Sequence, residues 1–451
     1  MKKYLFFWIL AVSICFVVGG FVGCADNTIY EPENAQMEKR EQLRENLSHE
    51  VTQAMARENL EKILPDLKLP STRGGDSKLP PITSVYTRGK AAIETRAGEE
   101  IEPYFHIFNF GDNEGFAIMS GDDRVEPLLA LTFEGELTPE TEIDNPGFEI
   151  AYSRMEDYYV QQVSSRAIEI PGTDIPPRDS IPTTMIEIDT TINLQCGPCL
   201  VKWGNDYPYN IYCTVSPGNH RVPVPSTCVA IAQLMSIYKF PESYYSYIYN
   251  RTFTFDWDEM NLYTSNRNSN IYVADSSKYN QIARLYKQLC ASPNLNVMFN
   301  EYNLSEPGKC HPNDIPKTFT NFGYSSGGVQ IDYDTDQVVA ELCAGYPVLI
   351  GGSEQGIVNN ELHRHRWLGH GLMQLNSTTY HYNLLHGWVA LEPLVSYYIL
   401  CNWGKDGDDD GYYLSGIFDT NLGPDIPETR SGNVVEGYYQ YNIDAFINIR
   451  K

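Results

Sequence analysis

The stretch Pro223-Val-Pro-Ser-Thr-Cys-Val-Ala-Ile-Ala-Gln-Leu-Met-Ser-Ile-Tyr238 decides how the second half of this chain folds. Pro223 and Pro225 end the preceding structure, and Ser226 and Thr227 are residue types that cap a helix start. From Thr227 onward apolar residues occupy almost every side of the predicted helix. Because such a helix has no face for water, it is expected to lie inside a core rather than on one.

Cys228 is placed in the first turn of this helix. A helix N-terminus carries partial positive charge and free N–H groups, which favour a thiolate over a thiol and provide a donor for a developing oxyanion. Cys228 is therefore a candidate nucleophile. The competing interpretation is a cysteine buried in the core or in a disulfide.

A thiolate nucleophile needs a base that also protonates the leaving group. His386 begins an apolar strand predicted for Leu385 to Leu391, and a turn at Glu392-Pro393 leads into a second strand that ends at Asn402. The 16 residues between His386 and Asn402 are enough for a strand, a turn and a returning strand, which predicts a Cys/His/Asn arrangement. The competing interpretation is a core histidine.

Four further histidines crowd the segment from Glu354 to Asn383, which is interpreted as a long loop. Their spacing matches no metal-binding motif, so no metal site is expected. They are His363, His365, His370 and His381.

The N-terminus has the pattern of an export signal. Lys2 and Lys3 precede an apolar run that ends in Phe21-Val-Gly-Cys24, so residues 1–23 are interpreted as a lipoprotein signal peptide with Cys24 as the site of lipid attachment. An uncleaved transmembrane anchor is the alternative. Residues 24–46 are polar and are expected to form a tether.

The remainder divides into two predicted domains of α+β class joined by a proline-rich segment. Residues 47–166 form the first domain, residues 167–190 a linker suited to proteolytic nicking, and residues 191–451 the second domain. The first domain is expected to begin with a helix over Val51 to Leu64 and a loop over Leu69 to Arg96. Two strand-like stretches, Tyr104 to Phe110 and Gly115 to Ser120, then precede an apolar stretch from Val125 to Leu131 and a second helix around Phe148 to Val163.

Composition excludes some classes of function. The formal net charge of -25 leaves no basic surface for nucleic acid or for anionic lipid. Cys196-Gly-Pro-Cys199 is a CxxC motif, but no second CxxC accompanies it, so a redox dithiol and half of a zinc site remain minor alternatives. No cofactor is expected.

Six ordered segments resemble the streptopain family of papain-like cysteine peptidases. They are Lys202-Trp-Gly-Asn205 with Pro208-Tyr-Asn210, Cys228-Val-Ala230 with Ala232 to Met235, Phe322-Gly-Tyr324, Pro347 to Gly352, His386-Gly-Trp-Val389, and Asn402-Trp-Gly404 with Asp410 to Tyr413. The first domain similarly resembles the pro-domain of this family and its inhibitor proteins through Phe108 to Phe110, Gly115 to Ile118 and Ser120 to Arg124.

The resemblance implies a papain-like peptidase domain and assigns the site residues. Cys228 would attack the scissile carbonyl, His386 would shuttle the proton, and Asn402 and Trp403 would orient and shield the imidazole. Asn205, where the family pattern has Gln, would hold the oxyanion.

The implied function is an exported endopeptidase of the cell envelope, lipid-anchored or secreted after processing. It would act on protein or peptide substrates and be inhibited by its own pro-domain, with membrane contact through the lipid. Two alternatives remain open. One is an inactive homologue that binds or inhibits, and the other is a Cys/His/Asn amidase or acyltransferase.

Overall fold

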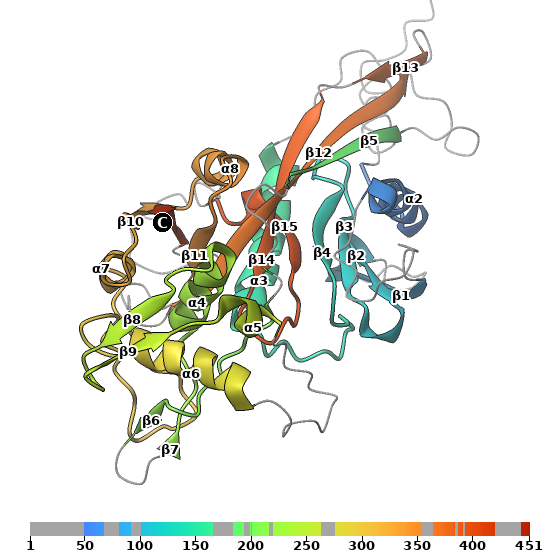
Figure 1. Ribbon diagram of the computed structural model, residues 1–451. Coiled ribbons are helices and arrows are strands. Elements are labelled where there is room, and N and C mark those ends of the chain that lie inside the picture. Colours follow the sequence, from blue (N-terminus) through green and yellow to red (C-terminus); the bar gives the residue numbers. More distant parts are fainter. Residues whose placement is uncertain are drawn as a thin grey trace, which may run out of the picture. The chain divides into compact units, whose positions relative to one another are not determined.

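The structure is a computed structural model that describes residues 49–66, 81–91, 101–165, 184–193, 199, 201–215, 220–262, 276–352, 364–383, 387–390, 393–419 and 443–451 (Figure 1). These residues belong to one unit that runs from His49 to Lys451. The signal peptide, Cys24 and the tether lie outside the described residues. Within the described ranges, no helix has the length and apolar character needed to cross a membrane.

The first domain confirms most of the predicted elements. Helix α2 (Gln53–Ile63) is capped by Thr52, whose Oγ1 accepts a hydrogen bond from the Met55 N–H. Three strands and a helix follow: β2 (Ile101–Phe110), β3 (Phe116–Ser120), β4 (Leu128–Thr132) and α3 (Pro146–Ser165). The predicted loop from Leu69 to Arg96 is wrong in part, because β1 (Ile82–Ala91) pairs with β2 there.

The linker also contains regular structure. Its last residues belong to β5 (Thr184–Asn193), which pairs with β12 (His365–Asn383). The proline-rich residues 166–183 lie outside the described part of the chain.

The second domain mixes helices and strands as expected for the α+β class, which is confirmed. Its helices are α4 (Ser226–Tyr238), α5 (Trp257–Asn261), α6 (Ser276–Cys290), α7 (Asp314–Asn321) and α8 (Thr335–Cys343). Its remaining strands are β6 (Thr214–Val215), β7 (His220–Arg221), β8 (Ser243–Ser246), β9 (Arg251–Thr254), β10 (Ser326–Asp332), β11 (Val348–Gly352), β13 (Gly387–Ala390), β14 (Leu394–Asn402), β15 (Gly411–Leu414) and β16 (Asp444–Arg450).

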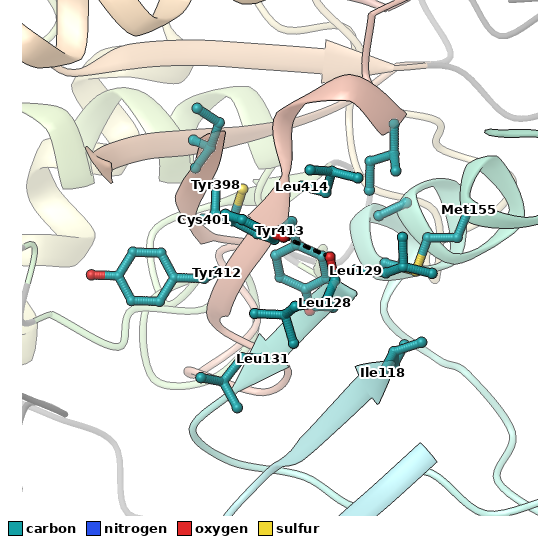
Figure 2. Packing of buried hydrophobic residues seen from close by; sticks show 14 of the residues in the cluster. Ile118, Leu128, Leu129, Leu131, Met155, Tyr398, Cys401, Tyr412, Tyr413 and Leu414 are labelled. Atoms are coloured by element: carbon teal, nitrogen blue, oxygen red, sulfur yellow. Dashed lines mark hydrogen bonds between the residues drawn. The ribbon is translucent and has the colours of Figure 1, made fainter. Parts of the chain in front are cut away.

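One antiparallel sheet joins the two domains. Its order is β1-β2-β3-β4-β15-β14-β12-β11-β16-β10, with β5 and β13 attached to β12. The junction is the β4–β15 pair, where Tyr412 faces Leu131. Figure 2 shows side chains from both domains packing at this junction, and the Tyr398 hydroxyl donates to the Leu128 carbonyl at 2.8 Å.

The buried helix is confirmed. All residues of α4 from Thr227 to Ser236 are buried, and the helix packs on β12 and on α6. The prediction that α4 is apolar and buried on almost every side is therefore confirmed. The packing of α4 on β12 places the N-terminus of α4 against the start of β12.

The long loop expected between Glu354 and Asn383 is wrong. Residues His365 to Asn383 form β12, a strand of 19 residues, which is paired along most of its length with β14 and β5. The predicted pairing of the His386 strand with the Asn402 strand is also wrong, because β13 pairs with the end of β12 instead.

Candidate active site

Cys228 does not face a cleft. Its side chain is 0% exposed, and its Sγ lies 3.4 Å from Sγ of Cys290 on α6. Burial raises the pKa of the Cys228 thiol, so the helix N-terminus does not produce the activated thiolate that the sequence suggested. The expectation of a cleft-facing Cys228 is therefore wrong.

The residue that does face a pocket is Ser226, the first residue of α4. Residues 226 and 228 are separated by about 200° around a helix, since each residue turns by ~100°. When Ser226 points to the pocket, Cys228 must point into the core. This two-residue offset is the reason for the error.

The pocket has a volume of about 330 Å³ and lies where α4 begins and β12 begins. Residues of both domains line it. The second domain contributes Asn205, Pro225 to Thr227, Glu306 to Cys310, Pro312, Ile315, Arg364 to Arg366, Gly404 and Lys405, and the first domain contributes Asp144, Pro146 and Ile150. A hydroxyl, an imidazole and a side-chain amide thus share one pocket.

Ser226 and His365 are held together by the backbone. The Arg366 N–H donates to Ser226 Oγ at 3.0 Å, and Arg366 directly follows His365 in β12. Because the Ser226 oxygen accepts this bond, its own proton is left to be donated elsewhere.

The contact that His365 makes defines its tautomer. His365 Nε2 lies 3.2 Å from the Trp403 carbonyl oxygen, which can only accept, so Nε2 carries the proton and Nδ1 keeps its lone pair. The pKa of His365 is lowered to about 4, mainly by burial; the Trp403 carbonyl acts to raise it, and the charge of Lys405 makes a smaller lowering contribution. The imidazole is therefore neutral at pH 7 and can act as a base.

A buried ion pair supports this part of β12. Arg366 Nη1 lies 2.9 Å from Asp444 Oδ1, and Arg364 Nη1 lies 3.3 Å from Asp444 Oδ2. The side chains of Arg366 and Asp444 are 2% and 3% exposed, so the pair is shielded from water. It holds the backbone that carries His365 and the donor to Ser226.

The predicted orienting residues have different roles from those expected. Asn402 Oδ1 accepts from Gln233 Nε2 at 2.7 Å, and Asn402 Nδ2 donates to the Val201 carbonyl at 2.9 Å. Asn402 therefore ties α4 to the preceding loop, and the backbone carbonyl of Trp403 makes the contact with the His365 imidazole. Asn205 does line the pocket, as the oxyanion role requires.

His386 lies outside the described residues, so its role stays a prediction. The neighbouring Gly387 pairs with Asn383, whereas Asn402 pairs with Leu368. These two positions on β12 are 15 residues apart, roughly 50 Å at ~3.3 Å per residue. Figure 1 shows β13 at the far end of β12.

Sequence reasoning missed Ser226 and His365. Ser226 was read only as a cap, although the first residue of a buried helix is the one at its open end. His365 was hidden in a stretch read as a loop. Its alternation with Trp367 and Gly369, which lie on one face of a strand, was the available signal.

The first domain covers the pocket. A Cβ placed on Gly147, in the first turn of α3, would lie 2.4 Å from Trp403 Cε3 and 2.9 Å from His365 Cδ2. The backbone of α3 thus lies directly against the imidazole. Asn145 Nδ2 fixes this approach by donating to the Asp408 carbonyl at 3.1 Å.

The part of the chain that the structure describes contains no candidate metal site. Among those residues, no group of three or more His, Cys, Asp or Glu side chains is arranged to hold a metal ion. Of the CxxC pair, only Cys199 is described; its N–H donates to His370 Nδ1 at 3.0 Å.

The N-terminus of a buried helix meets an antiparallel sheet that carries a histidine, and an attached domain covers this meeting point. This arrangement is that of papain-like peptidase domains with a pro-domain. Residues 203–413 match the Peptidase C10 family, and residues 46–159 match the Spi protease inhibitor family. The chain therefore contains a Peptidase C10 domain of the streptopain type, preceded by an inhibitor-type pro-domain, which confirms the resemblance seen in the sequence.

Individual relatives agree with this assignment over limited lengths. The thiol protease/hemagglutinin PrtT of Porphyromonas gingivalis is 27% identical over 180 residues, which is 37% of this chain. The match spans only 20% of the length of PrtT.

Two solved structures from Prevotella intermedia are also similar. A prointerpain A fragment is 17% identical, with a TM-score of 0.46 over 81% of this chain and 99% of that one. Active interpain A, a cysteine protease, is 19% identical, with a TM-score of 0.36 over 57% of this chain and 94% of that one.

Proposed function

We propose that the chain is an exported zymogen whose second domain hydrolyses peptide bonds in the pocket at the N-terminus of α4, with Ser226 as nucleophile and His365 as base. The observation that carries the proposal is the shared placement of the two groups. Arg366 N donates to Ser226 Oγ, and the next residue toward the N-terminus provides a neutral imidazole in the same pocket.

The proposed chemistry rests on the shared pocket of Ser226 and His365 and on the tautomer of His365. Nδ1 of His365 takes the proton of the Ser226 hydroxyl as Oγ attacks the peptide carbonyl, and the same proton then goes to the leaving amine. The acyl group on Ser226 is released by water, which His365 deprotonates in turn. The Trp403 carbonyl stabilises the imidazolium through its contact with Nε2 in both steps.

The oxyanion has two donors within reach of this arrangement. One is the N-terminus of α4, whose first turn carries partial positive charge, although the Cys228 N–H already donates to the Pro225 carbonyl at 2.9 Å. The other is the Asn205 side-chain amide at the pocket wall. Loss of one such donor typically costs about 10²- to 10³-fold in rate.

The pro-domain supports the zymogen part of the proposal. Gly147 is packed on His365 and Trp403, and Asp144, Pro146 and Ile150 fill one wall of the pocket. A peptide cannot approach the imidazole while α3 begins there. Cleavage between residues 166 and 183, the proline-rich segment, would allow the first domain to leave.

The experiment compares three forms of the full chain, each treated with an activating protease and assayed on unfolded casein. The wild type is expected to hydrolyse casein, Ser226→Ala to lose about 10³-fold or more, and Cys228→Ala to retain activity. Circular dichroism checks that each variant is folded. Loss of activity in Cys228→Ala together with full activity in Ser226→Ala would instead support the assignment made from sequence.

A second candidate function is peptide binding without hydrolysis. It is favoured by Ser226 itself, because a hydroxyl is not ionised at neutral pH, whereas the family relies on a thiolate. If the wild type binds casein peptides but does not cleave them, the binding function is correct. The Ser226→Cys variant is then expected to react with a thiol-directed epoxide at position 226.

Export and lipid attachment at Cys24 remain part of the proposal. They are supported by the apolar run from Tyr4 to Val22 and the small residue before Cys24. A mass spectrum of the mature N-terminus tests both, since a diacylated Cys24 has a defined added mass.

A further inference from the structure

The charge of the pocket is opposite to that of the chain. The chain has a formal net charge of -25, yet the pocket wall built by the second domain contains four cations. These are Lys309, Arg364, Arg366 and Lys405. Among the described carboxylates, Glu306 lies in the wall, Asp444 lies behind the two arginines, and Asp409 interacts electrostatically with Lys405, so the four cations outnumber these three carboxylates.

Lys405 is a wall cation on the loop that contacts the imidazole of His365. It follows Trp403, whose carbonyl contacts His365, and Gly404, which also lines the pocket. Burial is the main cause that lowers the pKa of His365, and Lys405 makes a smaller contribution in the same direction.

The pro-domain places an acidic side chain on this lysine. Asp144 Oδ2 lies 3.6 Å from Lys405 Nζ, and three residues later Gly147 contacts His365. Asp144 is 71% exposed and Lys405 is 22% exposed, so the pair contributes little to stability. The ion pair instead indicates what fits beside Lys405, because a chain segment with a carboxylate already occupies this part of the pocket.

We infer that Lys405 forms a subsite for an acidic side chain of the bound peptide, and that Asp144 of the pro-domain occupies this subsite before activation. The inference rests on the proposed pocket being the place where peptide binds, and it does not require that the bound peptide be cleaved. The ligand class is a peptide with a Glu or Asp beside the segment that lies on His365.

Binding to the full chain after treatment with the activating protease, which removes the covering first domain, tests the subsite separately from hydrolysis. The receptor carries Ser226→Ala, which prevents turnover. The probes are two fluorescein-labelled hexa-alanine peptides with a central Glu or a central Gln, and fluorescence anisotropy gives the affinity of each.

The Glu peptide is expected to bind at least threefold more tightly than the Gln peptide, and the preference is expected to shrink as salt rises. Adding Lys405→Met should abolish the preference, and Lys405→Glu should reverse it toward a peptide with a central Lys. The Lys239→Met variant, which changes an exposed lysine on the C-cap of α4, is the matched control and should keep the preference.

Equal affinity for the Glu and Gln peptides, no binding of either, or a preference that survives Lys405→Met would each overturn the inference. Failure of the casein assay would overturn the proposed hydrolysis and leave this result untouched. Before protease treatment the Glu peptide should bind more weakly, because the first domain covers the pocket and Asp144 lies on the same lysine.

Discussion

Asp444→Asn is the perturbation for which the structure gives the clearest magnitude. Asp444 is 2% exposed and faces Arg366 at 2.9 Å and Arg364 at 3.3 Å. Removal of its charge leaves two guanidinium groups in a buried site without a counter-ion. Breaking a buried pair in this way typically costs about 3–5 kcal/mol, because the remaining charge is desolvated and uncompensated.

Urea unfolding followed by circular dichroism measures this loss. The matched control is Asp258→Asn, which breaks the exposed ion pair between Lys239 and Asp258. Asp258 is 81% exposed, and removing such a pair should cost less than about 1 kcal/mol. The comparison therefore separates the effect of burying the ion pair from the effect of removing one charge.

The reasoning is refuted if Asp444→Asn changes the free energy of unfolding by no more than the control does. A second variant, Asp444→Leu combined with Arg366→Met, should recover part of the loss, since a buried pair replaced by apolar groups of similar size is often neutral. Because Arg366 N also donates to Ser226, the single variant should lower hydrolysis as well as stability.

Two further predictions concern the docking of α3 on the pocket and the imidazole of His365. Gly147→Ala should weaken docking of α3 by about 1–3 kcal/mol, because its Cβ would lie 2.4 Å from Trp403. Proteolytic activation should therefore be faster in Gly147→Ala than in the control Ser164→Ala, an exposed change on the same helix. Equal activation rates in the two variants would contradict the prediction. The pKa of His365 is lowered to about 4 in the folded chain, below the ordinary 6.5. The unfolded chain therefore takes up a proton first, so stability is full above about pH 6.5 and falls as pH drops toward 4, by up to about 1.4 kcal/mol per pH unit. Urea midpoints at pH 7.5 and 5 should differ less in His365→Asn, and an equal difference in both proteins would count against the assignment.

The sequence by itself determined the local elements and the family. An all-round apolar pattern was enough to predict α4 as a buried helix, because no partly exposed helix tolerates that pattern. The strand-like stretches Tyr104 to Phe110 and Gly115 to Ser120 similarly predicted β2 and β3 in the first domain. The match to the streptopain family rested on ordered motifs, which survive even where single positions have changed.

Tertiary structure decided which side chains meet. Along α4 the choice between Ser226 and Cys228 depends on a rotation of about 200°, and only the packing of α6 and β12 fixes that rotation. Ser226 and His365 are 139 residues apart in the sequence, and β12 reaches the helix through pairing with strands that the sequence did not connect. Local pattern carries no information on such pairing, since hydrogen-bonded register is set by partners distant in the chain.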